Sequence, residues 1–198
     1  MRRRPLPKIE PIRPVRRTTV PLGAAWLYEL KLDGFRGVLS LQNGHGSFIS
    51  KTGKPMPRFQ DLANAIARVM PLESAIMDGE IIVMTEARPD FNALFFRRGA
   101  PAYAAFDLLW LDGRDLRAQP LWRRKRALKK LLEQTPVAYV EHMNDPALFA
   151  AAAELDLEGI VAKRRSDPYE VTTEWVKVKY AGYTRMKGRQ ELFEKRRR

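Results

Sequence analysis

Short apolar runs that end at Asp-Gly or Asn-Gly pairs dominate the first half of the chain. Residues 26–32 form a β-prone run that closes at Asp33-Gly34, and residues 36–41 form a second run that ends at Asn43-Gly44. Two such runs separated by a tight turn indicate antiparallel strands. Further strands are expected at 48–50, 75–77, 80–84, 103–111, 159–162 and 175–179, with a turn at Asp78-Gly79 between the second and third of these.

Three other segments show helical periodicity instead. Apolar residues recur at helical spacing from Phe59 to Met70, and Pro71 ends the segment. Residues 120–134 place leucines on one side and Arg or Lys elsewhere, which indicates a basic helix with a solvated face, and residues 146–155 form an Ala-rich helix. Strands and helices alternate without a repeating βαβ rhythm, so the pattern favours an α+β fold with antiparallel sheets flanked by helices.

The first 23 residues do not fit either pattern. They contain five prolines, which lack a backbone N–H and interrupt regular hydrogen bonding. We therefore expect an extended, basic, Pro-rich segment over residues 1–23, one folded domain over 24–184 and a basic tail over 185–198.

The chain has 198 residues, of which 45% are hydrophobic, as is usual for about one globular domain. Its formal net charge is +13, with a pI near 10.3, which predicts a polyanionic partner. The excess lies mainly at the ends, because residues 1–17 carry a net +6 and residues 185–198 a net +5.

The composition also excludes several classes of site and of location. No cysteine is present, so there is no disulfide and no thiolate zinc site, and the two histidines exclude a His-rich metal site. Residues 1–20 lack the unbroken apolar stretch of a signal peptide, and no run reaches membrane-spanning length. We expect a cytoplasmic protein that does not bind membranes.

Candidate chemistry gathers around the first predicted turn, in the sequence Glu29-Leu-Lys31-Leu-Asp-Gly-Phe-Arg36. A lysine that acts as a nucleophile must lose its proton, which partial burial or nearby cations favour. Lys163, Lys177 and Lys179 lie on or at the ends of other predicted strands, and amines converging on Lys31 would suit a triphosphate. Hard cations prefer oxygen ligands, so we expect Glu80 and Glu158 to lie near a divalent ion.

Six ordered motifs resemble those of the covalent nucleotidyltransferases, which include ATP-dependent DNA ligases, RNA ligases and mRNA capping enzymes. They are Lys31-Leu-Asp-Gly-Phe-Arg36, Ser50-Lys51-Thr-Gly, Asp78-Gly-Glu80, Tyr103-Ala-Ala-Phe106-Asp-Leu-Leu, Glu158-Gly-Ile-Val-Ala-Lys163 and Trp175-Val-Lys177-Val-Lys179. The fourth and fifth most resemble the ligase module of bacterial end-joining DNA ligases. The resemblance implies an ATP-grasp-like nucleotidyltransferase fold, with residues 24–184 as the adenylation domain.

The resemblance also implies a reaction and a set of roles. Lys31 would attack the α-phosphate of ATP, AMP would pass from Lys31 to a DNA 5′-phosphate, and a 3′-hydroxyl would displace AMP to seal a strand break during DNA repair or recombination. Carried over by position, the AMP- and ATP-binding residues would be Glu29 at the adenine edge, Phe106 stacked on the base, Arg36 and Glu80 at the ribose, and Lys51, Lys163, Lys177 and Lys179. Glu158 and Glu80 would hold Mg²⁺ or Mn²⁺.

Three features differ from the family pattern. Lys51 stands where the family usually has arginine, which replaces a bidentate contact with a point charge. The segment between Tyr169 and Trp175 is shorter than in end-joining ligases and lacks a phosphate-facing arginine. The chain also ends about where an oligonucleotide-binding (OB) barrel would begin, so we expect no C-terminal OB barrel.

The expected substrate is nicked or broken double-stranded DNA, and the expected oligomeric state is a monomer. Without a barrel, a separate DNA-end-binding or OB-domain protein is an additional candidate partner. We expect the basic ends to contact DNA phosphates, and the residues concerned are Arg2, Arg3, Arg4, Arg16, Arg17, Arg196, Arg197 and Arg198.

Three alternatives to a minimal DNA ligase stay open from the sequence. The chain could be a DNA-binding accessory protein that keeps the fold but does not seal nicks. It could be an RNA ligase, or it could be a fragment of a longer ligase.

Overall fold

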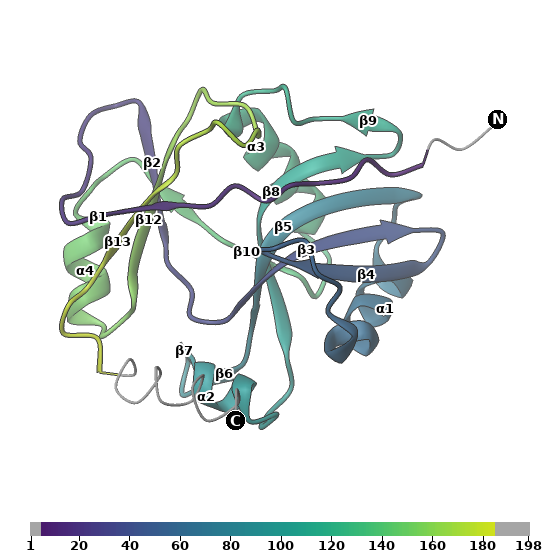
Figure 1. Cartoon of the computed structure of the whole chain (residues 1–198), viewed down its shortest axis with the longest axis horizontal. Helices are drawn as coiled ribbons and strands as arrows, with labels where there is room; N and C mark the ends of the chain where they lie inside the picture. The colour runs from purple at the N-terminus through teal and green to yellow at the C-terminus, as the bar shows by residue number, and fades with distance from the viewer. Residues whose placement is uncertain (1–4, 185–198) are drawn as a thin grey trace.

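The computed structural model describes residues 5–184, and two antiparallel-rich sheets organise this part of the chain (Figure 1). The first sheet has five strands in the order β1-β13-β12-β2-β11. All its pairings are antiparallel except the parallel pair of β1 with β13. Its strands are β1 (Val15–Arg17), β2 (Trp26–Leu30), β11 (His142–Met143), β12 (Gly159–Arg164) and β13 (Val176–Lys179).

The second sheet has the order β10-β8-β5-β3-β4, and β9 pairs with β8 beside this path. Its long central strands are antiparallel, whereas β10 pairs with β8 in parallel. Its strands are β3 (Phe35–Gln42), β4 (His45–Ser50), β5 (Ser74–Ile82), β8 (Ala102–Leu111), β9 (Arg114–Asp115) and β10 (Ala138–Tyr139). A separate two-stranded ribbon consists of β6 (Met84–Thr85) and β7 (Arg88–Pro89).

Within residues 5–184, four α-helices lie against these sheets, which confirms the predicted α+β class with helices flanking antiparallel sheets (Figure 1). The predicted helices at 59–70, 120–134 and 146–155 are present with slightly shorter bounds. The helices are α1 (Gln60–Val69), α2 (Phe91–Phe95), α3 (Leu121–Leu132) and α4 (Leu148–Glu154), and a 3₁₀ turn (Pro57–Phe59) precedes α1. None of the helices in residues 5–184 has the length and apolarity to cross a membrane.

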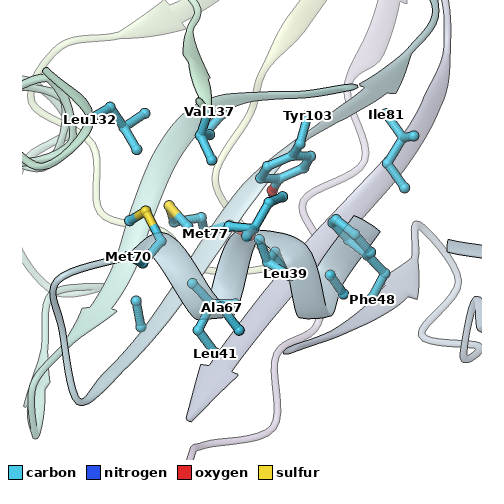
Figure 2. Packing of buried hydrophobic residues seen from close by; sticks show 14 of the residues in the cluster. Leu39, Leu41, Phe48, Ala67, Met70, Met77, Ile81, Tyr103, Leu132 and Val137 are labelled. Atoms are coloured by element: carbon cyan, nitrogen blue, oxygen red, sulfur yellow. The ribbon is translucent and has the colours of Figure 1, made fainter. Parts of the chain in front are cut away.

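The largest hydrophobic cluster packs α1 and α3 against the second sheet. Ala67 and Met70 at the end of α1 lie over Leu39 and Leu41 of β3, as Figure 2 shows. Because α1 presents its apolar stripe to the sheet, its polar residues are left at the surface, as the sequence pattern predicts. The central strands are thereby fixed in place, and they carry the motif residues Arg36 on β3, Glu80 on β5 and Phe106 on β8.

Two predicted turns are wrong in detail. Asp78-Gly79 lies inside one continuous strand, β5, because β3 and β8 pair with β5 on both sides of it. A Cβ at Gly79 would lie 2.4 Å from the carbonyl oxygen of Ala104, so this glycine permits a close strand approach. Asp33-Gly34 does not close a hairpin either, since β2 and β3 belong to different sheets and this segment links them.

The expectation that residues 1–23 lack regular hydrogen bonding is wrong for part of this segment. Val15–Arg17 form β1, which pairs with β13 beside Lys177. Ile9 and Ile12 are buried in a second hydrophobic cluster with Trp175. The prolines precede β1 or follow it, so they do not prevent an edge strand from forming.

Candidate active site

The chain passes from the first sheet to the second at Lys31, directly after β2. The backbone N–H of Lys31 donates to the carbonyl of Gly159 at 2.9 Å, which fixes this residue beside the start of β12. Its ammonium lies 2.5 Å from Glu158 Oε2, and the ammonium of Lys179 lies 2.7 Å from Glu158 Oε1. We call these three residues the open clamp, because the lysine side chains are 22% and 24% exposed while Glu158 is only 2% exposed.

Two further lysines lie near the open clamp. Lys177 is two residues before Lys179 on β13, so both project from the same face of the strand. Burial lowers the pKa of Lys177, and the neighbouring charges of Lys31, Lys179 and Lys51 lower it further. Lys51 is exposed in the turn after β4. The structure thus brings together Glu158 and four of the predicted ATP-binding lysines, which are Lys31, Lys51, Lys177 and Lys179.

The carboxylates of Glu158 and Glu80 differ in charge behaviour. Burial alone would raise the pKa of Glu158, but Lys31 and Lys179 hold it below its usual value. Burial raises the pKa of Glu80 to about 7, with only partial relief from Lys31 and Arg36. Glu80 lies on β5 opposite Arg36 of β3, and the charge of Glu158 acts on it. The two expected metal ligands therefore share one electrostatic environment.

A second carboxylate held between two lysines lies deeper in the protein. Glu29 of β2 accepts from Lys125 at 2.6 Å on Oε1 and from Lys163 at 2.5 Å on Oε2. All three side chains are at most 2% exposed, so we call this group the buried clamp. Burial opposes charge on Glu29, but the two lysines offset it and lower the pKa of Glu29. The desolvation of Lys163 lowers its pKa to about 8.

Aromatic rings border the buried clamp. Lys163 Nζ lies 4.1 Å from the ring centroids of both Phe106 and Trp175, and these two rings meet edge to face at 5.8 Å. The guanidinium of Arg36 lies 4.8 Å from the Phe106 centroid. Phe106 is only partly buried, so part of the residue is exposed to solvent. Cations near an aromatic face are favourable when they are desolvated, and they keep the rings in a fixed orientation.

Arg36 is held by Asp78, which the sequence pattern alone predicts to lie in a turn. Its Nε and Nη2 donate to the two oxygens of Asp78 at 2.6 and 2.5 Å, and Tyr169 donates to Asp78 at 2.6 Å. Asp78 is fully buried on β5, and its charge raises the pKa of Arg36 further. A bidentate pair of this kind fixes the guanidinium plane against Phe106.

Lys125 is a residue that sequence reasoning missed. The basic segment of α3 was predicted to be a solvated face, but Lys125 and its neighbour Arg124 are each 1% exposed. Arg124 makes a bidentate pair with buried Asp107. A signal was present, because positions 124 and 125 fall on the same helical stripe as Leu121, Leu128 and Leu132.

The remaining predicted contacts fall outside this centre. Arg16 is exposed on β1, and Arg17 pairs with Glu174 at the surface at 2.7 Å. Of the expected DNA-contacting residues, Arg2, Arg3, Arg4, Arg196, Arg197 and Arg198 lie outside the described residues. Within residues 5–184, no group of three or more His, Cys, Asp or Glu side chains could hold a metal ion by itself.

A family model described as the ATP dependent DNA ligase domain matches residues 10–179. The chain is 35% identical over 190 residues to the multifunctional non-homologous end joining protein LigD of Pseudomonas aeruginosa, covering 85% of this chain and 22% of that one. It is 32% identical over 173 residues to the SPbeta prophage-derived DNA ligase-like protein LigB of Bacillus subtilis, covering 80% and 63%.

A solved structure of mycobacterial DNA ligase D complexed with ATP and MES superposes with a TM-score of 0.74 and 29% identity, covering 86% of this chain and 60% of that chain. The ligase domain of M. tuberculosis LigD gives a TM-score of 0.73 and 30% identity, covering 85% and 58%. The chain thus spans less than two thirds of these relatives. The similarities confirm the predicted nucleotidyltransferase fold and the resemblance to end-joining ligase modules.

Proposed function

The chain belongs to the ATP-dependent DNA ligase domain family, and from this premise we propose that it is the adenylation module of a ligase that seals DNA strand breaks. Lys31, once its ammonium has released a proton to solvent, attacks the α-phosphorus of ATP. A P–N bond forms, the bond to the β-phosphate oxygen breaks, and pyrophosphate leaves. AMP then passes to a DNA 5′-phosphate, and a 3′-hydroxyl displaces AMP as the phosphodiester bond forms.

The open clamp carries this proposal. Lys31 and Lys179 lie on the two sides of Glu158, 2.5 and 2.7 Å away, and both remain partly exposed to an incoming ligand. Glu158 accepts from both ammonium groups, and its single negative charge balances only one of their two positive charges. A triphosphate can replace Glu158 as the partner of these cations, because positioning and charge neutralisation are the main requirements of phosphoryl transfer. Lys177 and Lys51 would extend the contact along the phosphates.

Glu80 and Glu158 are the residues that would hold a divalent ion. Mg²⁺ is usually bound through one or two carboxylates together with substrate phosphates, so two carboxylates beside a triphosphate fit this ion. Mn²⁺ accepts the same oxygen ligands. The ion would neutralise charge on the phosphates as pyrophosphate leaves.

The region around the buried clamp would receive the nucleoside. Glu29 would accept a hydrogen bond from the adenine edge, and Phe106 would provide the stacking surface. Arg36, held by Asp78 and lying over Phe106, would border the ribose together with Glu80. Lys163 pairs with Glu29 and lies over the Phe106 ring, so it would hold the residue that binds the adenine edge next to the residue that stacks on the base.

The DNA contacts belong to the same proposal. Arg16 and Arg17 on β1 lie beside β13, so phosphates bound there would pass close to Lys177. Together with the terminal arginines outside the described residues, they would hold DNA through phosphate contacts. We place the activity in a bacterial cytoplasm, where DNA substrate is available, with a separate DNA-end-binding or OB-domain protein as a candidate partner.

Nick sealing by the purified chain tests the proposed function. A duplex with one labelled 5′-phosphate nick should be joined in the presence of ATP and Mg²⁺ or Mn²⁺, and Lys31→Ala should join none. An RNA nick sealed in preference to a DNA nick would show an RNA ligase instead. DNA binding without adenylation would show an accessory protein and would contradict the proposal.

A further inference from the structure

The side chain of Lys125 runs from α3 into the interior, unlike the other lysines of this helix. Lys125 is 1% exposed, whereas Lys129, one turn later, is 54% exposed and pairs with Glu141 at the surface. A buried ammonium is costly unless acceptors surround it. Burial of this ammonium has a free-energy cost that its hydrogen-bond acceptors must offset. The positions of these acceptors show which parts of the site Lys125 holds in place.

The ammonium of Lys125 uses all three of its N–H donors. It donates to Glu29 Oε1 at 2.6 Å, to the carbonyl of Val140 at 3.1 Å and to the carbonyl of Phe106 at 3.3 Å. Glu29 lies on β2, Val140 lies in the link from β10 to β11, and Phe106 lies on β8. Lys125 thus fixes the carboxylate of Glu29 relative to the backbone of Phe106, the residue that would stack on the base.

Held in this way, the carboxylate of Glu29 offers only hydrogen-bond acceptors to a ligand. An ionised carboxylate has about four acceptor positions and no donor. Lys125 and Lys163 occupy one position on each oxygen, so acceptor capacity remains for a ligand. An acceptor-only edge pairs with the 6-amino group of adenine and opposes the 6-oxo group of guanine, which is also an acceptor.

We propose that Lys125 is a specificity-determining positioning residue, which holds Glu29 so that the site selects a 6-aminopurine nucleotide over a 6-oxopurine nucleotide. This inference rests on the proposed function, because it requires that a purine nucleoside triphosphate is the ligand that reaches Lys31. Lys125 itself need not touch the nucleotide. Its effect passes through the orientation of Glu29 and the position of Phe106.

The test measures base selectivity in two ways, by equilibrium binding and by covalent labelling. Calorimetry gives the dissociation constants of ATP and GTP, and α-labelled ATP or GTP gives the rate of adduct formation. The proteins are the wild type, Lys125→Met, Lys125→Arg and the matched control Lys129→Met. The binding arm does not require catalysis, so it tests Lys125 even if no adduct forms.

We expect the wild type and Lys129→Met to prefer ATP by about 100-fold or more, as buried polar discrimination allows. Lys125→Met should lose about 10-fold or more of this preference, mainly through weaker ATP binding. Lys125→Arg keeps the charge but cannot reproduce three donors at one nitrogen, so its preference should be intermediate. If Lys125→Met does not fold, Lys125→Arg decides the question.

An unchanged ATP-to-GTP ratio in Lys125→Arg or Lys125→Met, with both nucleotides weakened equally, would overturn the inference and leave Lys125 a purely structural residue. A wild type without base preference, or without nucleotide binding, would overturn it as well. A wild type that prefers ATP in binding but forms no adduct would contradict the proposed function, and the variants would still decide the role of Lys125.

Discussion

The buried clamp and the open clamp have the same chemical composition in two different environments. Each contains one glutamate between two lysines, with N–O distances of 2.5 to 2.7 Å. In the buried clamp the lysines are 1% exposed, and in the open clamp they are 22% and 24% exposed. Because of this difference in lysine exposure, Glu29 must keep its two lysine partners, whereas the lysines paired with Glu158 can also bind other groups.

Solvent access explains this separation. Breaking a buried pair leaves an uncompensated charge in a medium of low polarity, which is strongly unfavourable. At the open clamp the glutamate is equally buried but both lysines are partly exposed, so water or phosphate oxygens can bind Lys31 and Lys179 alongside Glu158. We therefore propose that the buried clamp serves base recognition and that the open clamp serves phosphate chemistry, and the following variants test this division.

The largest effect on stability is expected for Glu29→Gln. The substitution leaves Lys125 and Lys163 buried without a carboxylate, which should lower the free energy of unfolding by about 3–5 kcal/mol. Urea denaturation measures the change. Glu141→Gln is the matched control, since its pair with Lys129 is exposed and should contribute less than about 1 kcal/mol. Equal losses in both variants would remove the distinction between buried and exposed pairs.

At the open clamp, Lys179→Met should affect chemistry more than folding. The free energy of unfolding should fall by about 1–3 kcal/mol, less than for Glu29→Gln, because Glu158 is buried but keeps its contact with Lys31. The rate of lysine adenylation should fall about 10- to 100-fold, since one phosphate-facing cation is lost. Single-turnover labelling gives the rate, and urea denaturation gives the stability. A variant that unfolds readily but adenylates normally would assign Lys179 to the fold.

The pH dependence of the free energy of unfolding tests the environment of Lys163 in the buried clamp. The pKa of Lys163 is about 8 in the folded protein and near its usual value of about 10.5 when unfolded. Between these values the unfolded chain binds more protons, so the contribution of Lys163 makes the free energy of unfolding rise with pH. Relative to Lys163→Met, the wild type should gain about 1–2 kcal/mol from pH 8 to 9.5. Parallel pH profiles of the two proteins would contradict this assignment.

The smallest effect on folding is expected at the surface pair of Arg17 and Glu174, whose side chains are 50% and 45% exposed. Arg17→Ala should change the free energy of unfolding by less than about 0.5 kcal/mol. If Arg17 contacts a DNA phosphate, the logarithmic salt dependence of DNA binding should become shallower by about one unit. Binding at several salt concentrations measures this slope, and an unchanged slope would remove Arg17 from the DNA contact.

Sequence patterns predicted much of this molecule because local spacing carries the information. The stripe of α1 and the apolar runs of β3 and β8 require only the neighbouring residues to be recognised. The ordered motifs identified Lys31, Glu158 and Lys179, and the structure brings these three together.

Other features depend on contacts between distant segments. Asp78-Gly79 reads as a turn until β3 and β8 pair with β5 on both sides. Lys125 reads as a surface lysine, because its acceptor Glu29 lies 96 positions earlier in the chain. The N-terminal prolines conceal β1, since its partner β13 lies near the end of the described residues.

Covalent labelling at Lys31 tests the central claim most directly. The wild-type chain is incubated with α-labelled ATP and Mg²⁺ or Mn²⁺, and the modified peptide is identified by mass spectrometry. The account predicts one AMP group per chain, joined through an acid-labile P–N bond to Lys31 and absent from Lys31→Ala. An adduct on Lys163 or Lys179, or label retained by Lys31→Ala, would contradict it.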